Sequence, residues 1–180
     1  MYINLLIQIK YTKSHLTISC IILQIMVIYN QMDIYHRGIK IMSNNCFYCQ
    51  KNEALDELMI KVCDLEASTL YLFKEQTYKG RCLVAFNGHK NELFDLTDEE
   101  RDVFMKDVTK AAKAMKIAFD VNKVNYGAYS DKMPHLHFHL VPKYEDGPGW
   151  GGTFEMMPSP KVLLTDEEYT QLINKVKENL

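Results

Sequence analysis

The alternating histidines of "PHLHFHLVPKY", residues 134–144, constrain the fold of this chain more than any other feature. His135, His137 and His139 occupy every second position. Side chains along a β-strand point to opposite faces of the sheet with a period of two, so the three imidazoles are predicted to share one face. Leucine and phenylalanine occupy the positions between them. The stretch therefore predicts a strand with one polar, reactive face and one apolar face in the core.

Short apolar or alternating runs predict four further strands after residue 42. Gly80 is the natural turn between the second and third of them. These runs cover residues 57–65, 68–76, 80–87 and 123–130, and the histidine strand is expected over 135–142, ending at a proline.

Two amphipathic helices are predicted over residues 97–120 and 165–180. The first begins at Thr97 with Glu100 three residues later, the spacing of a capping box, and the same spacing recurs from Thr165. Apolar side chains follow at helical intervals in both. Between the histidine strand and the second helix lies the glycine- and proline-rich loop "EDGPGWGGTFEMMPSP", which is longer than a simple connection requires.

Residues 1–41 differ in composition from the rest of the chain. They hold eleven isoleucines and one acidic residue, whereas residues 42–180 hold three isoleucines and twenty-two acidic residues. The apolar run "LTISCIILQIMVIY" is shorter than the roughly 20 residues that a membrane-spanning helix needs. We expect Met42 to be the functional start, residues 1–41 to be an atypical extension, and residues 42–180 to form one domain.

The overall charge and the cysteine count narrow the class of protein. A formal charge of −2, with both signs spread along the chain, gives no broad basic surface for nucleic acid, and no membrane association is expected. Five cysteines, an odd number, favour reduced thiols and hence a cytoplasmic location. Cys46 and Cys49 form a CxxC pair, which is typical of half a metal site or of a redox pair, or occurs by chance.

Three imidazoles on one face need partners, and two arrangements would supply them. In one, the three histidines chelate a catalytic metal and leave a fourth position for water. In the other, one histidine is a nucleophile and its neighbours organise an anion. The CxxC pair favours the second: a closed zinc site needs four ligands, and His89 and His135 would complete a Cys2His2 set with Cys46 and Cys49. His137 and His139 would then be free of metal.

With these motifs in place, the chain resembles the histidine triad (HIT) family of nucleotidyl hydrolases and transferases. The resemblance covers about residues 46–158 and rests on "PHLHFHLVPKY", on "GRCLVAFNGHKNELFDLT" before the long helix, and on "CFYC". It implies an α+β fold with a roughly five-stranded antiparallel sheet, a long helix and a C-terminal helix. It also implies a structural zinc on the same four ligands, and a homodimer.

The resemblance also assigns roles to the remaining site residues. His137 corresponds to the family's nucleophile, and His139 is expected to stabilise phosphate charge. Asn125 resembles a phosphate-contacting asparagine, with an ordinary strand-end residue as the alternative. Apart from the resemblance, the position of Ser130 and Lys132 in the loop before the triad would let a backbone amide or a cationic head meet oxyanions, although a solvated lysine explains Lys132 equally well. Trp150, in "WGG", would cover a base or a leaving group, or would simply seal the core.

Two positions depart from the family pattern. Many members carry a histidine where this chain has Arg81, and an acidic residue that reads the ribose where this chain has Phe73, with Glu75 nearby. Base and ribose recognition are therefore not predicted.

The expected function is hydrolysis of a nucleoside-phosphate derivative, such as a dinucleoside polyphosphate or a phosphoramidate, through a nucleotidyl-histidine intermediate. Three alternatives stay open. They are a transferase that uses an acceptor other than water, a nucleotide-binding module with little turnover, and a three-histidine metal hydrolase.

Overall fold

The computed structural model describes residues 46–180, and the extension expected over residues 1–41 lies outside the described residues. The described elements, in chain order, are α2 (Phe47–Gln50), α3 (Glu53–Leu58), β1 (Met59–Asp64), β2 (Ser68–Phe73), β3 (Cys82–Phe86), the 3-10 helix η1 (Leu93–Asp95), α4 (Asp98–Phe119), β4 (Lys123–Gly127), β5 (His137–Lys143) and α5 (Asp166–Lys177). The five strands and the two amphipathic helices predicted from the sequence are confirmed. The helices α2, α3 and η1 are additional, because runs of three to six residues are too short to show a helical period.

The five strands form one antiparallel sheet in the order β1-β2-β3-β5-β4. The strands β1, β2 and β3 follow one another as a meander, and Gly80 occupies the turn before β3 with a φ of +88°, where a glycine is favoured. β5 enters the sheet between β3 and β4, so the histidine strand is hydrogen-bonded on both sides.

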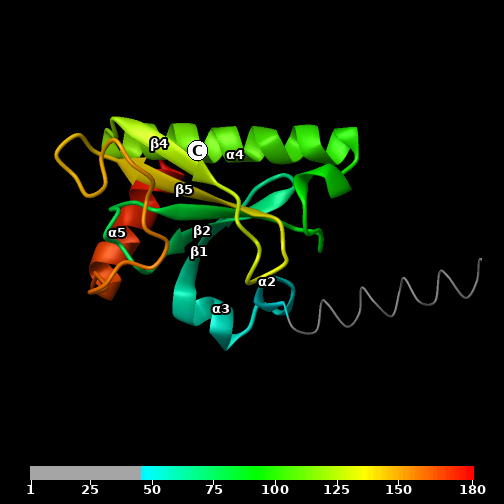
Figure 1. Ribbon diagram of the computed structural model, residues 1–180, viewed down its shortest axis with the longest axis horizontal. Helices are drawn as coiled ribbons and strands as arrows, with labels where there is room; N and C mark the ends of the chain where they lie inside the picture. The colour runs from blue at the N-terminus through cyan, green and yellow to red at the C-terminus, as the bar shows by residue number, and fades with distance from the viewer. Residues whose placement is uncertain (1–45) are drawn as a thin grey trace, which may run out of the picture. The chain divides into compact units, whose positions relative to one another are not determined.

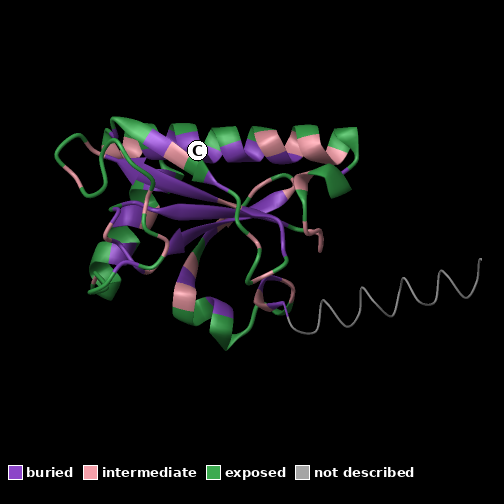
Figure 2. Ribbon diagram, viewed as in Figure 1, coloured by how far each residue is buried: buried purple, intermediate pink, exposed green. Residues whose placement is uncertain are grey.

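α4 lies across one face of this sheet (Figure 1). The side of α4 that faces the strands is buried, and its other side is exposed (Figure 2). Its buried apolar side chains recur at helical spacing: Phe104, Val108, Ala111, Ala112 and Met115. They pack with Leu70, Leu72, Val84 and Leu140 of the sheet in the main core. Because this stripe of α4 packs against one face of the sheet, the histidines of β5 lie on the opposite face.

Both predicted capping boxes are present. Thr97 Oγ1 accepts from the Glu100 amide at 3.2 Å, and the Thr97 amide donates to Glu100 Oε2 at 3.0 Å. Thr165 and Glu168 form the same pair at the start of α5. Each box satisfies amides that the first helical turn leaves without partners, which fixes where the helix begins.

The buried carboxylate of Asp107 connects α4 to the turn between β1 and β2. Its two oxygens accept from the amide of Glu66 at 3.3 Å, the amide of Ala67 at 2.8 Å and the hydroxyl of Ser68 at 2.7 Å. A charged group in a core requires such partners, because burying it unpaired is costly. Asp107 therefore sets the position of α4 along the sheet.

β5 differs from its predicted range at both ends. It begins at His137, because the His135 amide donates to the Met133 carbonyl at 2.7 Å in a tight turn and so leaves the strand ladder. It continues past Pro142 to Lys143. A proline is tolerated there, because the ladder with β3 has already ended at Leu140 and β5 keeps only its β4 neighbour.

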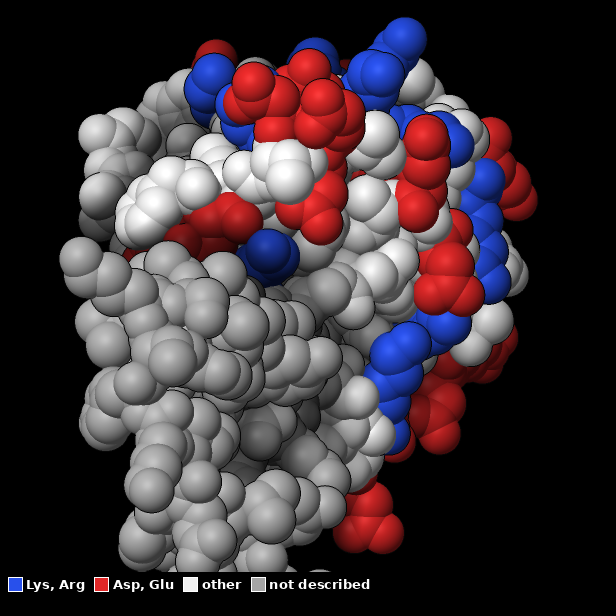
Figure 3. Space-filling model, turned by 90° about the vertical axis from the view of Figure 1, so that its right-hand side faces the viewer, with Lys and Arg blue, Asp and Glu red and all other residues white. Residues whose placement is uncertain are grey.

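Charges of both signs are interspersed on the described part of the surface drawn in Figure 3. Among residues 46–180, no helix combines the length and the apolar character that crossing a membrane requires.

Candidate functional site

The centre of the sheet brings His137 and His139 together on the face opposite α4. In register, His137 lies beside Ala85 and His139 beside Leu83 of β3, while Phe138 and Leu140 point to the main core. The two imidazole rings are 5.0 Å apart at an interplanar angle of 73°. Each histidine is 6% exposed. The two imidazole rings therefore meet edge to face, and both are largely shielded from solvent.

Cys46, Cys49, His89 and His135 form the cluster that the sequence predicted. One ligand atom from each lies within 4.8 Å of all the others. Cys46 Sγ is 3.3 Å from His135 Nδ1, Cys49 Sγ is 3.2 Å from His89 Nδ1, and Cys49 Sγ is 3.6 Å from His135 Nδ1. Tetrahedral zinc with ordinary Zn–S and Zn–N bonds separates its ligand atoms by about 3.3–3.8 Å. The spacing therefore fits a four-coordinate metal ion.

A hydrogen bond at the other ring nitrogen also orients His135 as a metal ligand. His135 Nε2 lies 2.9 Å from the Phe86 carbonyl, which can only accept, so the ring proton is on Nε2 and Nδ1 presents its lone pair to the thiols. Burial lowers the pKa of His135 to about 4, which keeps the ring neutral. Burial raises the pKa of the Cys49 thiol to about 12, so a bound cation is needed to hold it as a thiolate.

The carbonyl of His135 also determines the protonation of His137. His137 Nδ1 donates to this carbonyl at 2.6 Å, which leaves the lone pair of His137 on Nε2. Burial lowers the pKa of His137, so the neutral ring is favoured. The Ser130 hydroxyl donates to the same oxygen at 3.1 Å, so its contact in this structure is with the backbone that orients His137.

His139 faces a buried guanidinium. Arg81 Nη2 lies 3.2 Å from His139 Nδ1, and Arg81 has no exposed surface. Burial, together with this cation and the neighbouring His137, lowers the pKa of His139 to about 2. Sequence reasoning noted Arg81 only as a departure from a family pattern. Arg81 stands at the start of a strand whose other residues are typical of a core. Nothing in that stretch of sequence indicates a partner on β5.

Tyr48 is a second residue that sequence reasoning missed. It occupies the third position of the CxxC stretch, and its ring stacks on His135 at 4.8 Å and lies 5.1 Å from His137. The aromatic identity of a residue inside a short cysteine loop was the available signal. The Tyr48 ring therefore contacts both His135 of the cluster and the imidazole of His137.

Of the remaining predicted residues, Asn125 and Trp150 lie near each other and Lys132 does not join them. Asn125 is on β4 opposite Val141, two residue pairs along from His139, and lines a hollow of about 330 Å³ with Lys143, Trp150 and the two glycines after it. Trp150 is 44% exposed there, so it does not seal the core. Lys132 is exposed in the loop before β5.

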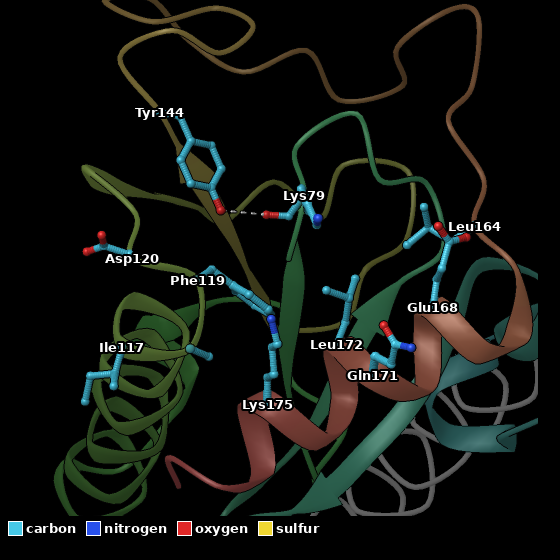
Figure 4. Close-up of a pocket in the computed structure, with 11 residues that line it drawn as sticks. Lys79, Ile117, Phe119, Asp120, Tyr144, Leu164, Glu168, Gln171, Leu172 and Lys175 are labelled. Atoms are coloured by element: carbon cyan, nitrogen blue, oxygen red, sulfur yellow. Dashed lines mark hydrogen bonds between the residues drawn. The ribbon is translucent and has the colours of Figure 1, made fainter.

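A larger hollow lies elsewhere, between the C-terminal end of α4 and one side of α5 (Figure 4). It measures about 550 Å³, and Phe119 and Leu172 supply apolar surface while Lys79, Lys175 and Glu168 supply charge. None of the triad or cluster residues lines it. Volume alone therefore does not mark the reactive site in this molecule.

Fold and site together define an antiparallel α+β protein with two triad histidines on the interior strand β5, the third just before it, and a Cys2His2 cluster beside them. Residues 59–146 match the family model described as the HIT domain. The chain thus carries a HIT domain, the domain of the histidine triad proteins, as the resemblance in sequence indicated.

Individual relatives agree with this assignment. Protein hit of Bacillus subtilis (strain 168) is 29% identical over 118 residues, covering 63% of this chain and 81% of that protein. The adenosine 5'-monophosphoramidase HNT1 of Saccharomyces cerevisiae is 29% identical over 107 residues, covering 58% of this chain and 66% of that protein. The crystal structure of a histidine triad protein from Sinorhizobium meliloti 1021 has the same fold, with a TM-score of 0.66 at 22% identity over 72% of this chain and 95% of that one.

Proposed function

We propose that this protein hydrolyses a nucleoside-phosphate derivative, of the phosphoramidate or dinucleoside polyphosphate type, with His137 as nucleophile. The observation that carries the proposal is the hydrogen bond from His137 Nδ1 to the His135 carbonyl. It directs the ring's free lone pair to Nε2, and low solvent exposure of His137 leaves that lone pair weakly hydrated.

The chemistry proceeds in two displacements. His137 Nε2 forms a bond to the α-phosphorus while the bond from phosphorus to the leaving oxygen or nitrogen breaks, and the leaving group departs with the electron pair and takes up a proton. Water then forms a phosphorus–oxygen bond, the phosphorus–nitrogen bond breaks, and the lone pair returns to Nε2 as water loses its proton. Splitting one hard hydrolysis into two steps is the advantage of a covalent intermediate.

The other predicted residues have subordinate roles in this proposal. His139 donates to a phosphate oxygen, as an oxyanion partner does. Asn125 and Trp150, which share the hollow beside β5, contact phosphate and leaving group respectively. Ser130 acts through the His135 carbonyl, and Lys132 supplies a mobile positive charge at the entrance to the site.

The cluster of Cys46, Cys49, His89 and His135 is proposed to hold a structural zinc. Its four ligand atoms fit closed tetrahedral coordination, which leaves no position for a catalytic water. A bound zinc would supply folding energy and would lock the segment that carries the His135 carbonyl. His137 and His139 are outside the cluster, which favours this reading over a three-histidine metal hydrolase.

The relatives support the substrate class at the level of the family. HNT1 of Saccharomyces cerevisiae and hnt1 of Schizosaccharomyces pombe are both described as adenosine 5'-monophosphoramidases, at 29% and 28% identity. A phosphoramidate is therefore the first substrate to test.

The deciding experiment is a substrate panel of adenosine phosphoramidates, dinucleoside polyphosphates and nucleotide sugars. It is run on the protein, on His137→Asn and on the surface variant Arg101→Gln. We expect free nucleoside monophosphate from at least one substrate, a loss of turnover of at least 1,000-fold in His137→Asn (on the order of the loss on removing a nucleophile), and no loss in Arg101→Gln. Full turnover by His137→Asn would contradict the assignment of the nucleophile.

The same panel separates the alternatives. A new nucleotidyl ester in the presence of an alcohol or sugar phosphate would identify a transferase. Nucleotide binding without turnover of any substrate would identify a binding module. Retention of structure with immediate loss of turnover on metal removal would favour the metal hydrolase.

Two further assignments, the oligomeric state and the cellular location, are each proposed from a single feature. A homodimer is supported by the edge strand β4, which pairs only with β5 among the described strands and exposes half of Tyr126. Light scattering at several concentrations tests it.

A cytoplasmic location is supported by the four described cysteines, which are all free thiols.

The functional unit is proposed to be residues 42–180, with residues 1–41 as an extension outside the domain. Intact-mass measurement of the protein from its natural source tests this boundary.

A further inference from the structure

Arg81 is the most deeply buried charged side chain near the triad, with no exposed surface. Its Nη2 is 3.2 Å from His139 Nδ1. A guanidinium carries only donors and has no lone pair to offer at ordinary pH. Nδ1 of His139 must therefore be the acceptor, which requires a neutral ring with its single proton on Nε2.

We propose that Arg81, held by Glu75, is a positioning residue that fixes His139 as the Nε2–H tautomer, so that the two triad imidazoles present opposite groups. His137 presents a lone pair at Nε2, because its Nδ1–H donates to the His135 carbonyl. His139 presents an N–H at Nε2, because its Nδ1 accepts from Arg81. The tautomer itself is a property of the protein, while its use in catalysis rests on the proposed function.

The two tautomers suit an anionic substrate. The nucleophile needs a lone pair aimed at phosphorus, and the oxygens of the same phosphate need a hydrogen-bond donor. If His139 carried its proton on Nδ1 instead, a second lone pair would face the phosphate oxygens and repel them. A doubly protonated His139 would add positive charge beside the buried arginine, which burial and the cation both oppose.

Glu75 supplies a negative charge beside the buried cation. Its Oε2 lies 3.9 Å from Arg81 Nη1, and the two side chains are 3% and 0% exposed. Glu75 Oε1 accepts from the Thr77 amide at 2.8 Å and from the Val162 amide at 3.3 Å, which holds the carboxylate in place. The guanidinium also lies over the Phe73 ring at 4.2 Å. The carboxylate thus offsets part of the cost of burying the guanidinium, without a direct hydrogen bond between the two groups.

The same guanidinium anchors the loop after β5. Arg81 Nη1 donates to the Met156 carbonyl at 2.9 Å, and Nη2 lies 3.0 Å from Met156 Sδ. The Phe154 ring lies 5.5 Å from the guanidinium and 6.3 Å from the His139 ring. The glycine-rich loop and His139 therefore share one anchor: Nη1 holds the loop carbonyl, and Nη2 contacts both His139 and the Met156 sulfur.

The direct test reads the tautomers by two-bond proton–nitrogen correlation in the full chain labelled with 15N-histidine. His139→Asn and His137→Asn assign the signals. We expect His139 to be protonated at Nε2 alone and His137 at Nδ1 alone, at neutral pH and without substrate. Protonation of His139 at Nδ1 would overturn the proposal, whether or not any substrate is turned over.

A variant series tests the connection to catalysis. Arg81→Met removes the donor at similar side-chain length, Arg81→Lys keeps a donor and the charge, and Arg101→Gln is the surface control. We expect kcat to fall about 100-fold in Arg81→Met, the order of one acid–base contribution, with KM changed less than about threefold. Arg81→Lys should recover most of the loss.

Two further measurements keep this series decisive. In a His139→Asn background, Arg81→Met should cost less than about twofold, because residues that act as a unit are not additive; losses that multiply would overturn the proposal. If Arg81→Met leaves Glu75 unpaired and fails to fold, the double variant with Glu75→Gln removes that unpaired charge. The tautomer spectrum of the unaltered protein decides the first part of the proposal independently of both.

Discussion

The ring of Tyr48 lies 5.1 Å from the ring of His137, although Tyr48 belongs to α2, between two cysteines of the proposed metal site. The same tyrosine stacks on His135. The segment that carries the two cysteines of the cluster thus also supports the proposed nucleophile through a direct aromatic contact.

Tyr48→Ala should lower kcat about 10-fold and destabilise the protein by about 3 kcal/mol, because it removes a buried ring and leaves a cavity beside His137. Tyr48→Phe should stay within twofold of the unaltered protein, because the stacked ring is retained. Steady-state kinetics and denaturant unfolding measure the two effects. Equal losses in both variants would instead point to the hydroxyl.

Removal of one thiol should release the metal. We expect about one zinc per chain in the purified protein and very little in Cys49→Ser, because a site with three remaining ligands is no longer closed. The melting temperature should fall as well. Cys63→Ser on β1, a free thiol outside the cluster, is the matched control and should keep its zinc. Elemental analysis with calorimetry makes the comparison, and undiminished zinc in Cys49→Ser would exclude that ligand.

Asp107→Ala should reduce the free energy of unfolding by about 3 kcal/mol, because it leaves the amide of Ala67 and the hydroxyl of Ser68 without their acceptor. Asp107→Asn should cost less, since one acceptor oxygen remains. Asp102→Ala, which is exposed on the same helix, should change stability by no more than about 0.5 kcal/mol. Chemical denaturation at neutral pH tests all three.

His139 should make stability depend on pH in acid. Its pKa is lowered in the folded state to about 2, first by burial and then by Arg81. The unfolded chain binds this proton near pH 6.5, so its contribution to stability is complete above that pH and decreases as pH falls toward the folded pKa. The slope reaches about 1.4 kcal/mol per pH unit for one proton. His139→Asn, which keeps an acceptor for Arg81, should show a correspondingly shallower slope between pH 6 and pH 4.

Much of the fold follows from local sequence signals. The period of two in "HLHFHL" predicts β5, and the Thr–Glu spacing at Thr97 and Thr165 predicts where α4 and α5 begin. The Cys2His2 cluster was predictable because zinc demands four ligands and the chain offered two thiols with two suitable histidines. In each case the determining chemistry lies in a short stretch or in the identity of the ligand.

What could not be predicted depends on pairs that are distant in sequence. Arg81 is explained by His139 and Met156, which lie 58 and 75 residues further along the chain. His135 leaves the strand because of a backbone bond to Met133, which the period of two does not encode. The bounds of β5 likewise depend on where its neighbour β3 ends.

The interior position of β5 in the sheet has a consequence for motion. With β3 on one side and β4 on the other, its amides are among those expected to exchange with solvent only when the whole domain opens. His137 and His139 thus stand on one of the segments expected to exchange most slowly. Under the proposed function, catalysis would rely on a fixed pair of rings, so mild heating should loosen peripheral segments before it disturbs the triad.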